Sequence, residues 1–139
     1  MRIAIAGTGY VGIVTAGVLA DVGHTIICVD VDKKKIQKLK DGICPIFEPG
    51  LPELLKKNKG LLDFTSDYKK AYEDADVIFI AVGTPEKSDG SADLKYVFSV
   101  AKQIAQSVKK DTVVVVKSTV PIGTHDKVKI ILDEEIIEK

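Results

Sequence analysis

The sequence predicts an α/β fold in which helices cover both faces of a parallel sheet. Three observations support this prediction: strand-like runs alternate with helix-like segments, the strand runs are almost continuously apolar, and a glycine-rich turn joins the first strand to the first helix. Strands that are connected through helices run parallel, and both faces of such sheets are usually buried. We expect a doubly wound sheet with strand order 3-2-1-4-5, and we expect the sixth strand of this fold to be missing.

The first two strand and helix pairs are short and regular. Residues 2–6 form an apolar run that predicts the first strand. Residues 10–22 predict a helix, and its many glycines and alanines allow it to lie close against a sheet. Residues 25–29 predict the second strand, and residues 33–40 predict a short helix.

The middle of the chain holds a loop and weaker elements. Residues 41–50 contain two prolines and two glycines, so regular structure is not expected there. Residues 51–58 predict a short helix, and residues 62–65 predict a weak third strand. Ser66 or Asp67 is expected to cap a further helix, because a short polar side chain satisfies the free N–H groups at a helix start.

The second half of the chain repeats the alternation. Residues 77–82 predict a strong fourth strand, and residues 94–108 predict a helix with one apolar side. Residues 112–116 are almost all valine, which is typical of a strand that is covered on both faces. Residues 123–139 predict a closing helix, whose inward side is expected to carry Val128, Ile131, Leu132 and Ile136.

Composition indicates one globular domain over residues 1–139. Hydrophobic residues make up 45% of the chain, and 20 basic side chains balance 20 acidic ones. This balance favours neither a nucleic acid nor a membrane as partner, and no signal peptide or membrane span is apparent, so we expect a cytoplasmic protein. Cys28 and Cys44 form no C-x-x-C motif and have no histidine nearby, so we expect neither a disulfide framework nor a metal site, and we expect Cys28 to be buried.

The turn after the first strand matches the dinucleotide-binding fingerprint G-x-G-x-x-G of Rossmann-like folds. Gly7 allows a tight turn from strand to helix, Gly9 lets the backbone approach a pyrophosphate, and Gly12 lets helix and strand pack closely. The positive end of the helix dipole then faces the phosphates. The fingerprint alone is weak, but here a strand precedes it, a helix follows it, and an acidic residue closes the next strand.

Asp30 is that acidic residue, and it favours NAD over NADP. Its carboxylate can accept hydrogen bonds from the ribose hydroxyls and would repel a 2′-phosphate. Lys33 or Lys34 could in principle hold such a phosphate, but an exposed lysine contributes about 1 kcal/mol or less. This is less than the cost of placing a carboxylate beside a phosphate.

Two further loops are expected at the same edge of the sheet. Thr84 and Thr119 follow the fourth and fifth strands, and Pro85 and Pro121 fix the backbone beyond them. Threonine and proline are also common at helix starts for structural reasons alone, so this pattern has an alternative reading. His125 is the one histidine expected near this edge, and no set of catalytic residues is evident.

Taken together, five motifs resemble the NAD-binding domain of the nucleotide-sugar dehydrogenase family, and especially that of the UDP-glucose 6-dehydrogenases. They occur in the family's order over essentially the whole chain: Gly7-Thr-Gly-Tyr-Val-Gly12, Val29-Asp30, Pro45-Ile-Phe-Glu-Pro-Gly-Leu51, Val82-Gly-Thr-Pro85 with Asp89-Gly-Ser-Ala-Asp-Leu94, and Lys117-Ser-Thr-Val-Pro-Ile-Gly-Thr124. The fingerprint and the resemblance together predict nine NAD-binding residues: Gly7, Gly9, Tyr10, Val11, Gly12, Asp30, Lys35, Thr84 and Thr119.

The resemblance also implies an activity for a longer protein. Members of this family oxidise the C6 alcohol of a sugar nucleotide to the acid in two NAD-dependent steps, through a thiohemiacetal and a thioester on a cysteine. For UDP-glucose the product is UDP-glucuronate, and UDP-N-acetyl sugars or GDP-mannose are the next candidate substrates. Thr119 corresponds to a hydroxyl that holds a water near the reacting carbon, which makes it the one catalytic candidate.

Several parts of the family pattern have no counterpart in these residues. The cysteine nucleophile, the sugar-binding lysine and asparagine, and the central dimerising helix are not found in the 139 residues. We therefore expect the cofactor-binding part of a longer two-domain homodimer, which binds the UDP-sugar with its other domain, and no activity for this part alone. The alternatives are the NAD-binding domain of a different two-domain dehydrogenase, of the hydroxyacid or 6-phosphogluconate type, and a stand-alone NAD-sensing module.

Overall fold

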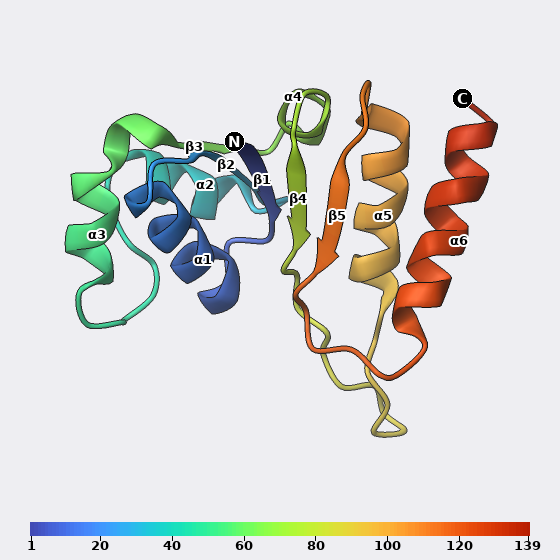
Figure 1. Ribbon diagram of the computed structural model, residues 1–139. Helices are drawn as coiled ribbons and strands as arrows, with labels where there is room; N and C mark the ends of the chain where they lie inside the picture. Colours follow the sequence, from blue (N-terminus) through green and yellow to red (C-terminus); the bar gives the residue numbers. More distant parts are fainter.

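The computed structural model describes residues 1–139 and contains one five-stranded parallel sheet (Figure 1). The strands are β1 (Arg2–Ala6), β2 (Thr25–Val29), β3 (Leu62–Thr65), β4 (Val77–Ile80) and β5 (Val113–Val116). The helices are α1 (Tyr10–Asp21), α2 (Lys33–Lys40), α3 (Leu51–Lys57), α4 (Tyr68–Tyr72), α5 (Lys95–Ser107) and α6 (Thr124–Ile137), with a 3-10 turn η1 (Lys59–Leu61) before β3. The strand order β3-β2-β1-β4-β5 confirms the predicted doubly wound topology.

The helices divide between the two faces of the sheet. Successive side chains of a strand point to opposite faces, so Ile3 and Ile5 of β1 join one core while Ala4 and Ala6 join the other. Helices α1, α2 and α3 cover the first face, and α4, α5 and α6 cover the second. No helix is both long and apolar enough to cross a membrane.

Strand β5 differs from the prediction because only one of its faces is well covered. Val114 and Val116 pack against the core beneath α5 and α6. On the other face Val113 is 61% exposed, because α1, α2 and α3 lie over the other half of the sheet, and β5 is the edge strand. Ile136 was predicted to point inward, but it is 49% exposed in the last turn of α6.

Strand β4 is also shorter than predicted and ends at Ile80. The carbonyl of Ile80 accepts hydrogen bonds from the backbone N–H groups of both Lys117 and Ser118, at 2.8 and 3.0 Å. Two donors on one carbonyl end the regular ladder between β4 and β5. The chain therefore leaves the sheet two residues earlier than expected and turns toward Thr84.

Polar side chains begin two of the helices. Asp32 accepts hydrogen bonds from the backbone of Lys34 and Lys35 at the start of α2. Asp67, one of the two predicted caps, accepts from Lys70 at the start of α4. Helix α1 has no side-chain cap, because glycine precedes it.

Two glycines permit the close contact between α1 and the end of β1. A Cβ atom on Gly12 would lie 1.9 Å from the carbonyl oxygen of Gly7, and a Cβ on Gly7 would lie 2.5 Å from the carbonyl oxygen of Ala81. Gly7 also has a φ of +104°, a conformation that favours glycine. The functions predicted for Gly7 in the turn and for Gly12 in close packing agree with these distances.

Replacing Gly12 by alanine should therefore destabilise the fold, by about 2 kcal/mol or more, the cost of overpacking against backbone. Gly17 in the same helix is a matched control, because a Cβ there would meet only flexible side chains, those of Leu54 at 2.9 Å and Leu51 at 3.5 Å, and no backbone atom. We expect G17A to stay within about 1 kcal/mol of the wild type, since alanine also favours the helix. Urea unfolding followed by circular dichroism measures both changes, and equal stability of the two variants would contradict this account.

Candidate functional site

The carboxyl ends of four adjacent strands place the predicted site residues along one edge of the sheet. In strand order, this edge carries Asp30 after β2, the Gly7–Gly12 turn after β1, Thr84 after β4 and Thr119 after β5. Figure 1 shows the loops after β4 and β5 leaving the sheet at the same, lower edge. Ligands of open parallel sheets bind at this edge, where the strand order reverses.

The start of α1 offers free backbone donors to an anion. The first N–H groups of a helix have no acceptor within it, and here Tyr10, Val11 and Gly12 provide them. A Cβ atom on Gly9 would meet no atom within 4 Å, so the backbone is open to an approaching ligand at that point. The turn thus separates two tasks: Gly7 and Gly12 permit the packing, and Gly9 leaves the space in front of the donors empty.

Asp30 is held rigidly beside this turn by Thr8. The backbone N–H and the hydroxyl of Thr8 both donate to Asp30 Oδ2, at 3.0 and 2.6 Å, and the N–H of Asp32 donates to Oδ1 at 2.9 Å. The Asp30 side chain is 13% exposed, and Lys35 Nζ lies 3.8 Å from Oδ2. Asp30 and Lys35, both predicted cofactor residues, are therefore in contact.

These contacts keep Asp30 ionised. Burial raises the pKa of Asp30, but the Thr8 hydroxyl, the N–H groups of Asp32 and Thr8, and the charge of Lys35 together bring it below its usual value. A carboxylate has about four lone-pair sites, and three already accept hydrogen bonds. The remaining capacity suits a ribose hydroxyl and is unsuited to a phosphate.

Tyr10 and Val11 line the exposed side of the turn. The Tyr10 side chain is 53% exposed, and its hydroxyl donates to Glu48 Oε2 at 3.1 Å. This hydrogen bond to the carboxylate raises the pKa of Tyr10. Val11 is exposed in the first turn of α1, so both side chains are accessible to a ligand at the edge.

The loops after β4 and β5 are tied to each other. The Thr84 hydroxyl donates to the backbone carbonyl of Thr119 at 3.0 Å, and the Ser118 hydroxyl donates to the carbonyl of Val82 at 2.8 Å. Thr119 itself is exposed. The structure therefore brings the two predicted threonines together and leaves the Thr119 hydroxyl directed to no acceptor within the chain.

Three residues of this edge were not predicted. Thr8 orients Asp30, Ser118 joins the last two loops, and Glu48 contacts Tyr10 from the 41–50 loop. The sequence does carry a signal for Thr8, because it lies between the first two glycines of the fingerprint and has a hydroxyl. The contacts of Ser118 and Glu48 join segments 36 and 38 residues apart, and local patterns do not predict such pairs.

The cysteines and His125 take no part in these contacts. Cys28 is fully buried in β2, as predicted, and burial raises the pKa of its thiol to about 12. Cys44 donates to the carbonyl of Ile46 at 3.3 Å in the loop after α2. His125 is exposed in the first turn of α6, and no group of three His, Cys, Asp or Glu side chains is arranged to hold a metal ion.

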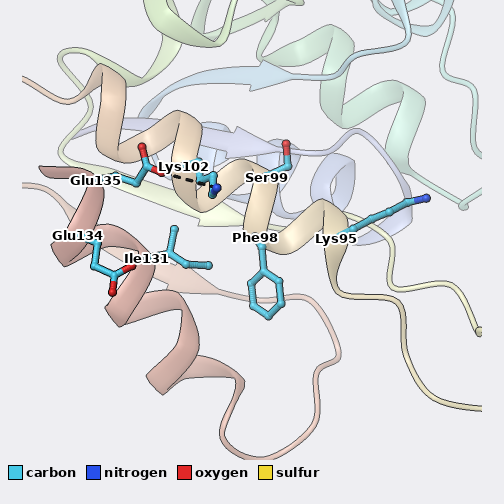
Figure 2. Close-up of a pocket in the computed structure, with 7 residues that line it drawn as sticks. All are labelled: Lys95, Phe98, Ser99, Lys102, Ile131, Glu134 and Glu135. Carbon is cyan, nitrogen blue, oxygen red and sulfur yellow. Dashed lines mark ion pairs between the residues drawn. The ribbon is translucent and has the colours of Figure 1, made fainter. Parts of the chain in front are cut away.

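A separate surface hollow lies between α5 and α6 and shares no residue with this edge (Figure 2). Phe98 and Ile131 form its apolar part, and the ion pair of Lys102 with Glu135 crosses it at 3.7 Å. It contains no glycine turn, and the backbone N–H of Lys95, at the start of α5, already donates to Asp93 Oδ1 at 3.1 Å. The hollow is the outer seam between two packed helices, and the sheet edge remains the candidate ligand site.

Comparison with known proteins now identifies the family. The family model for the NAD-binding domain of UDP-glucose/GDP-mannose dehydrogenases matches residues 1–139. The chain belongs to this family. Its cofactor is accordingly NAD, and the open Gly9 turn and the ionised Asp30 fit that dinucleotide.

Individual relatives are similar over nearly the whole chain. The UDP-glucose 6-dehydrogenase YwqF of Bacillus subtilis (strain 168) is 52% identical over 140 residues, which cover 99% of this chain and 32% of that protein. The UDP-glucose 6-dehydrogenase of Rhizobium meliloti (strain 1021) is 52% identical over 96% of this chain and 31% of its own length. The chain thus spans about a third of the length of these curated relatives.

Solved structures of the family have the same fold. A ternary complex of GDP-mannose dehydrogenase from Pseudomonas aeruginosa superposes with a TM-score of 0.92 at 46% identity, over 100% of this chain and 33% of that one. A UDP-glucose dehydrogenase from Pyrobaculum islandicum gives 0.91 at 39% identity, over 96% of this chain and 32% of its own. The Rossmann-like fold predicted from the sequence is therefore that of NAD-dependent nucleotide-sugar dehydrogenases.

Replacing Gly9 by valine is expected to abolish NADH binding and leave the thermal unfolding temperature almost unchanged. The valine side chain would fill the space in front of the free N–H groups, while nothing in the folded chain lies within 4 Å of its Cβ. Titration of NADH fluorescence and a thermal melt measure the two effects. A G9V variant that binds NADH as tightly as the wild type would show that the pyrophosphate does not contact this turn.

Proposed function

We propose that residues 1–139 form one NAD-binding domain and that the dinucleotide lies along the sheet edge from Asp30 to Thr119. The observation that carries this proposal is the ionised Asp30, fixed by Thr8 beside the open turn at Gly9. A carboxylate and a set of free N–H groups on neighbouring strands match the ribose and pyrophosphate of one dinucleotide. Family membership agrees with this assignment.

Different residues of the edge contact different parts of the cofactor. The pyrophosphate contacts the turn and the first residues of α1, which are Gly7, Gly9, Tyr10, Val11 and Gly12. The adenosine ribose hydrogen-bonds to Asp30, and Lys35 stabilises the charge of that carboxylate from 3.8 Å. The nicotinamide end lies toward Thr84 and Thr119, on the strands at the opposite end of the line.

We further propose that the chain serves a nucleotide-sugar 6-dehydrogenase acting on the C6 alcohol of UDP-glucose. Two relatives at 52% identity carry that name, whereas the GDP-mannose 6-dehydrogenase of Pseudomonas aeruginosa is 46% identical. NAD, when bound, supplies the hydride acceptor for each of the two oxidation steps. The UDP-sugar then contacts a further domain of a homodimeric protein, which contributes the cysteine nucleophile.

Within this chain, we propose that Thr119 acts near the reacting carbon. Its side chain is exposed at the end of β5, and its backbone carbonyl is fixed by the Thr84 hydroxyl. The hydroxyl is free to hold a water molecule beside the sugar. The Ser118 hydroxyl donates a hydrogen bond to the Val82 carbonyl. This bond keeps the loop that carries Thr119 against the loop that carries Thr84.

We expect the chain to bind NADH at least tenfold more tightly than NADPH. A 2′-phosphate beside the ionised Asp30 would face like-charge repulsion of several kcal/mol, and about 1.4 kcal/mol corresponds to tenfold. Calorimetric titration with both dinucleotides measures this ratio. D30N serves as the comparison, because it removes the charge and keeps the shape of the side chain, and it should narrow the difference between the NADH and NADPH affinities. Equal affinities of the wild type for the two dinucleotides would refute the role of Asp30.

We also expect no NADH formation when this 139-residue chain is mixed with NAD and UDP-glucose. Thioester chemistry requires a reactive thiolate beside the nicotinamide, whereas Cys28 is buried with a pKa of about 12, and Cys44 lies in the loop after α2, on the adenosine side. Absorbance at 340 nm monitors the reaction. The C28A/C44S double variant should bind NADH as the wild type does, and sustained NADH production that either cysteine substitution abolishes would overturn this assignment.

A further inference from the structure

Helix α1 contacts α3 and, at its start, the loop that leads into α3. In the middle, Leu54 of α3 packs against Gly17 of α1, which has no side chain to keep it away. At the far end, Asp21 pairs with Lys57 at 2.8 Å and accepts a hydrogen bond from Asn58 at 2.9 Å. At the near end, a single hydrogen bond links Tyr10, which follows Gly9, to Glu48 in the loop before α3.

That bond is the one from the Tyr10 hydroxyl to Glu48 Oε2, at 3.1 Å. Glu48 is itself held in place, because its carbonyl accepts from the N–H of Leu51, and Leu51 is buried in the core beneath α1. Gly50, with a φ of +84°, lets the chain turn between the loop and α3. The packing of α3 on α1 thus holds the Glu48 backbone where its carboxylate reaches the first turn of α1.

Gly12 packs the inner side of the first turn of α1 against the end of β1, but no side chain caps this turn. Gly9 provides no side-chain cap, and a glycine at this position loses much conformational freedom when it is ordered. Tyr10 is more than half exposed, so packing restrains its side chain only weakly. A capping side chain at the start of α1 would obstruct the ligand. The hydrogen bond from Tyr10 to Glu48 restrains the turn from its outer side instead.

We propose that Glu48 is a positioning residue for the cofactor: it holds Tyr10 so that the N–H groups at the start of α1 are ordered before the pyrophosphate arrives. Ordering a binding loop in advance removes part of the entropy cost of binding. The inference rests on the proposed function, because it requires NAD to bind at the Gly9 turn. It assigns a cofactor role to a residue of the 41–50 loop, which does not belong to the glycine fingerprint.

The test is a titration of NADH fluorescence with the wild-type chain and the variants E48A, E48Q, Y10F and Y10F/E48A. We expect E48A and Y10F each to weaken NADH binding about three- to tenfold, the range of one hydrogen bond. The double variant should be no weaker than the single ones, because both substitutions break the same bond. E48Q keeps an oxygen acceptor and should recover most of the affinity that E48A loses.

D21A is the matched structural control, since it breaks the ion pair and the hydrogen bond that join α1 to α3 at the other end. It should lower the unfolding temperature at least as much as E48A and change NADH affinity less than twofold. Loss of affinity in D21A equal to that in E48A would show that Glu48 acts only through helix docking and would overturn the proposal. Additive losses in the double variant, or tighter binding by E48A, would also overturn it.

The same titration separates this inference from the function on which it rests. Wild-type binding of NADH together with an unaffected E48A refutes the role of Glu48 and leaves the NAD site intact. Failure of the wild type to bind NADH refutes both. Weakened binding by E48A and Y10F, with recovery in E48Q, supports the proposal.

Discussion

The close approach of α1 to the turn after β1 is the constraint on which the rest of this structure depends. No side chain fits between Gly12 and the carbonyl of Gly7, nor between Gly7 and the backbone at Ala81. Because the helix start is pressed against two strands, its free N–H groups face the edge of the sheet and not the core. The same turn buries Thr8 and directs both of its donors to the carboxylate on the next strand.

Two opposite electrostatic features therefore lie side by side without cancelling each other. The start of α1 carries partial positive charge and has no side-chain cap, so it can accept the charge of a pyrophosphate. Asp30, on the neighbouring strand, keeps its negative charge because Thr8, Asp32 and Lys35 surround it with donors. This pairing fits the pyrophosphate and the ribose of one dinucleotide, as we propose for this edge.

The two halves of the sheet serve different purposes. Helices α1, α2 and α3 cover β1, β2 and β3 on one face, and their packing brings Glu48 to Tyr10 beside the Gly9 turn. The half formed by β4 and β5 contributes loops that hydroxyl groups tie together, and one face of β5 stays largely open. The curated relatives reported above are about three times as long as this chain, and we propose that the half formed by β1, β2 and β3 holds the nucleotide while the other half presents Thr119.

The sequence by itself determined the strand order, most element boundaries and the cofactor class, because these depend on local features. Apolar periodicity, the glycine spacing and the acidic residue after β2 are each properties of a short segment. Only the tertiary structure decided that β4 ends early, that one face of β5 is exposed, and that Thr8 and Glu48 hold Asp30 and Tyr10. Exposure depends on which helices reach a strand, and these hydrogen bonds join residues 22 and 38 positions apart, so no local pattern encodes them.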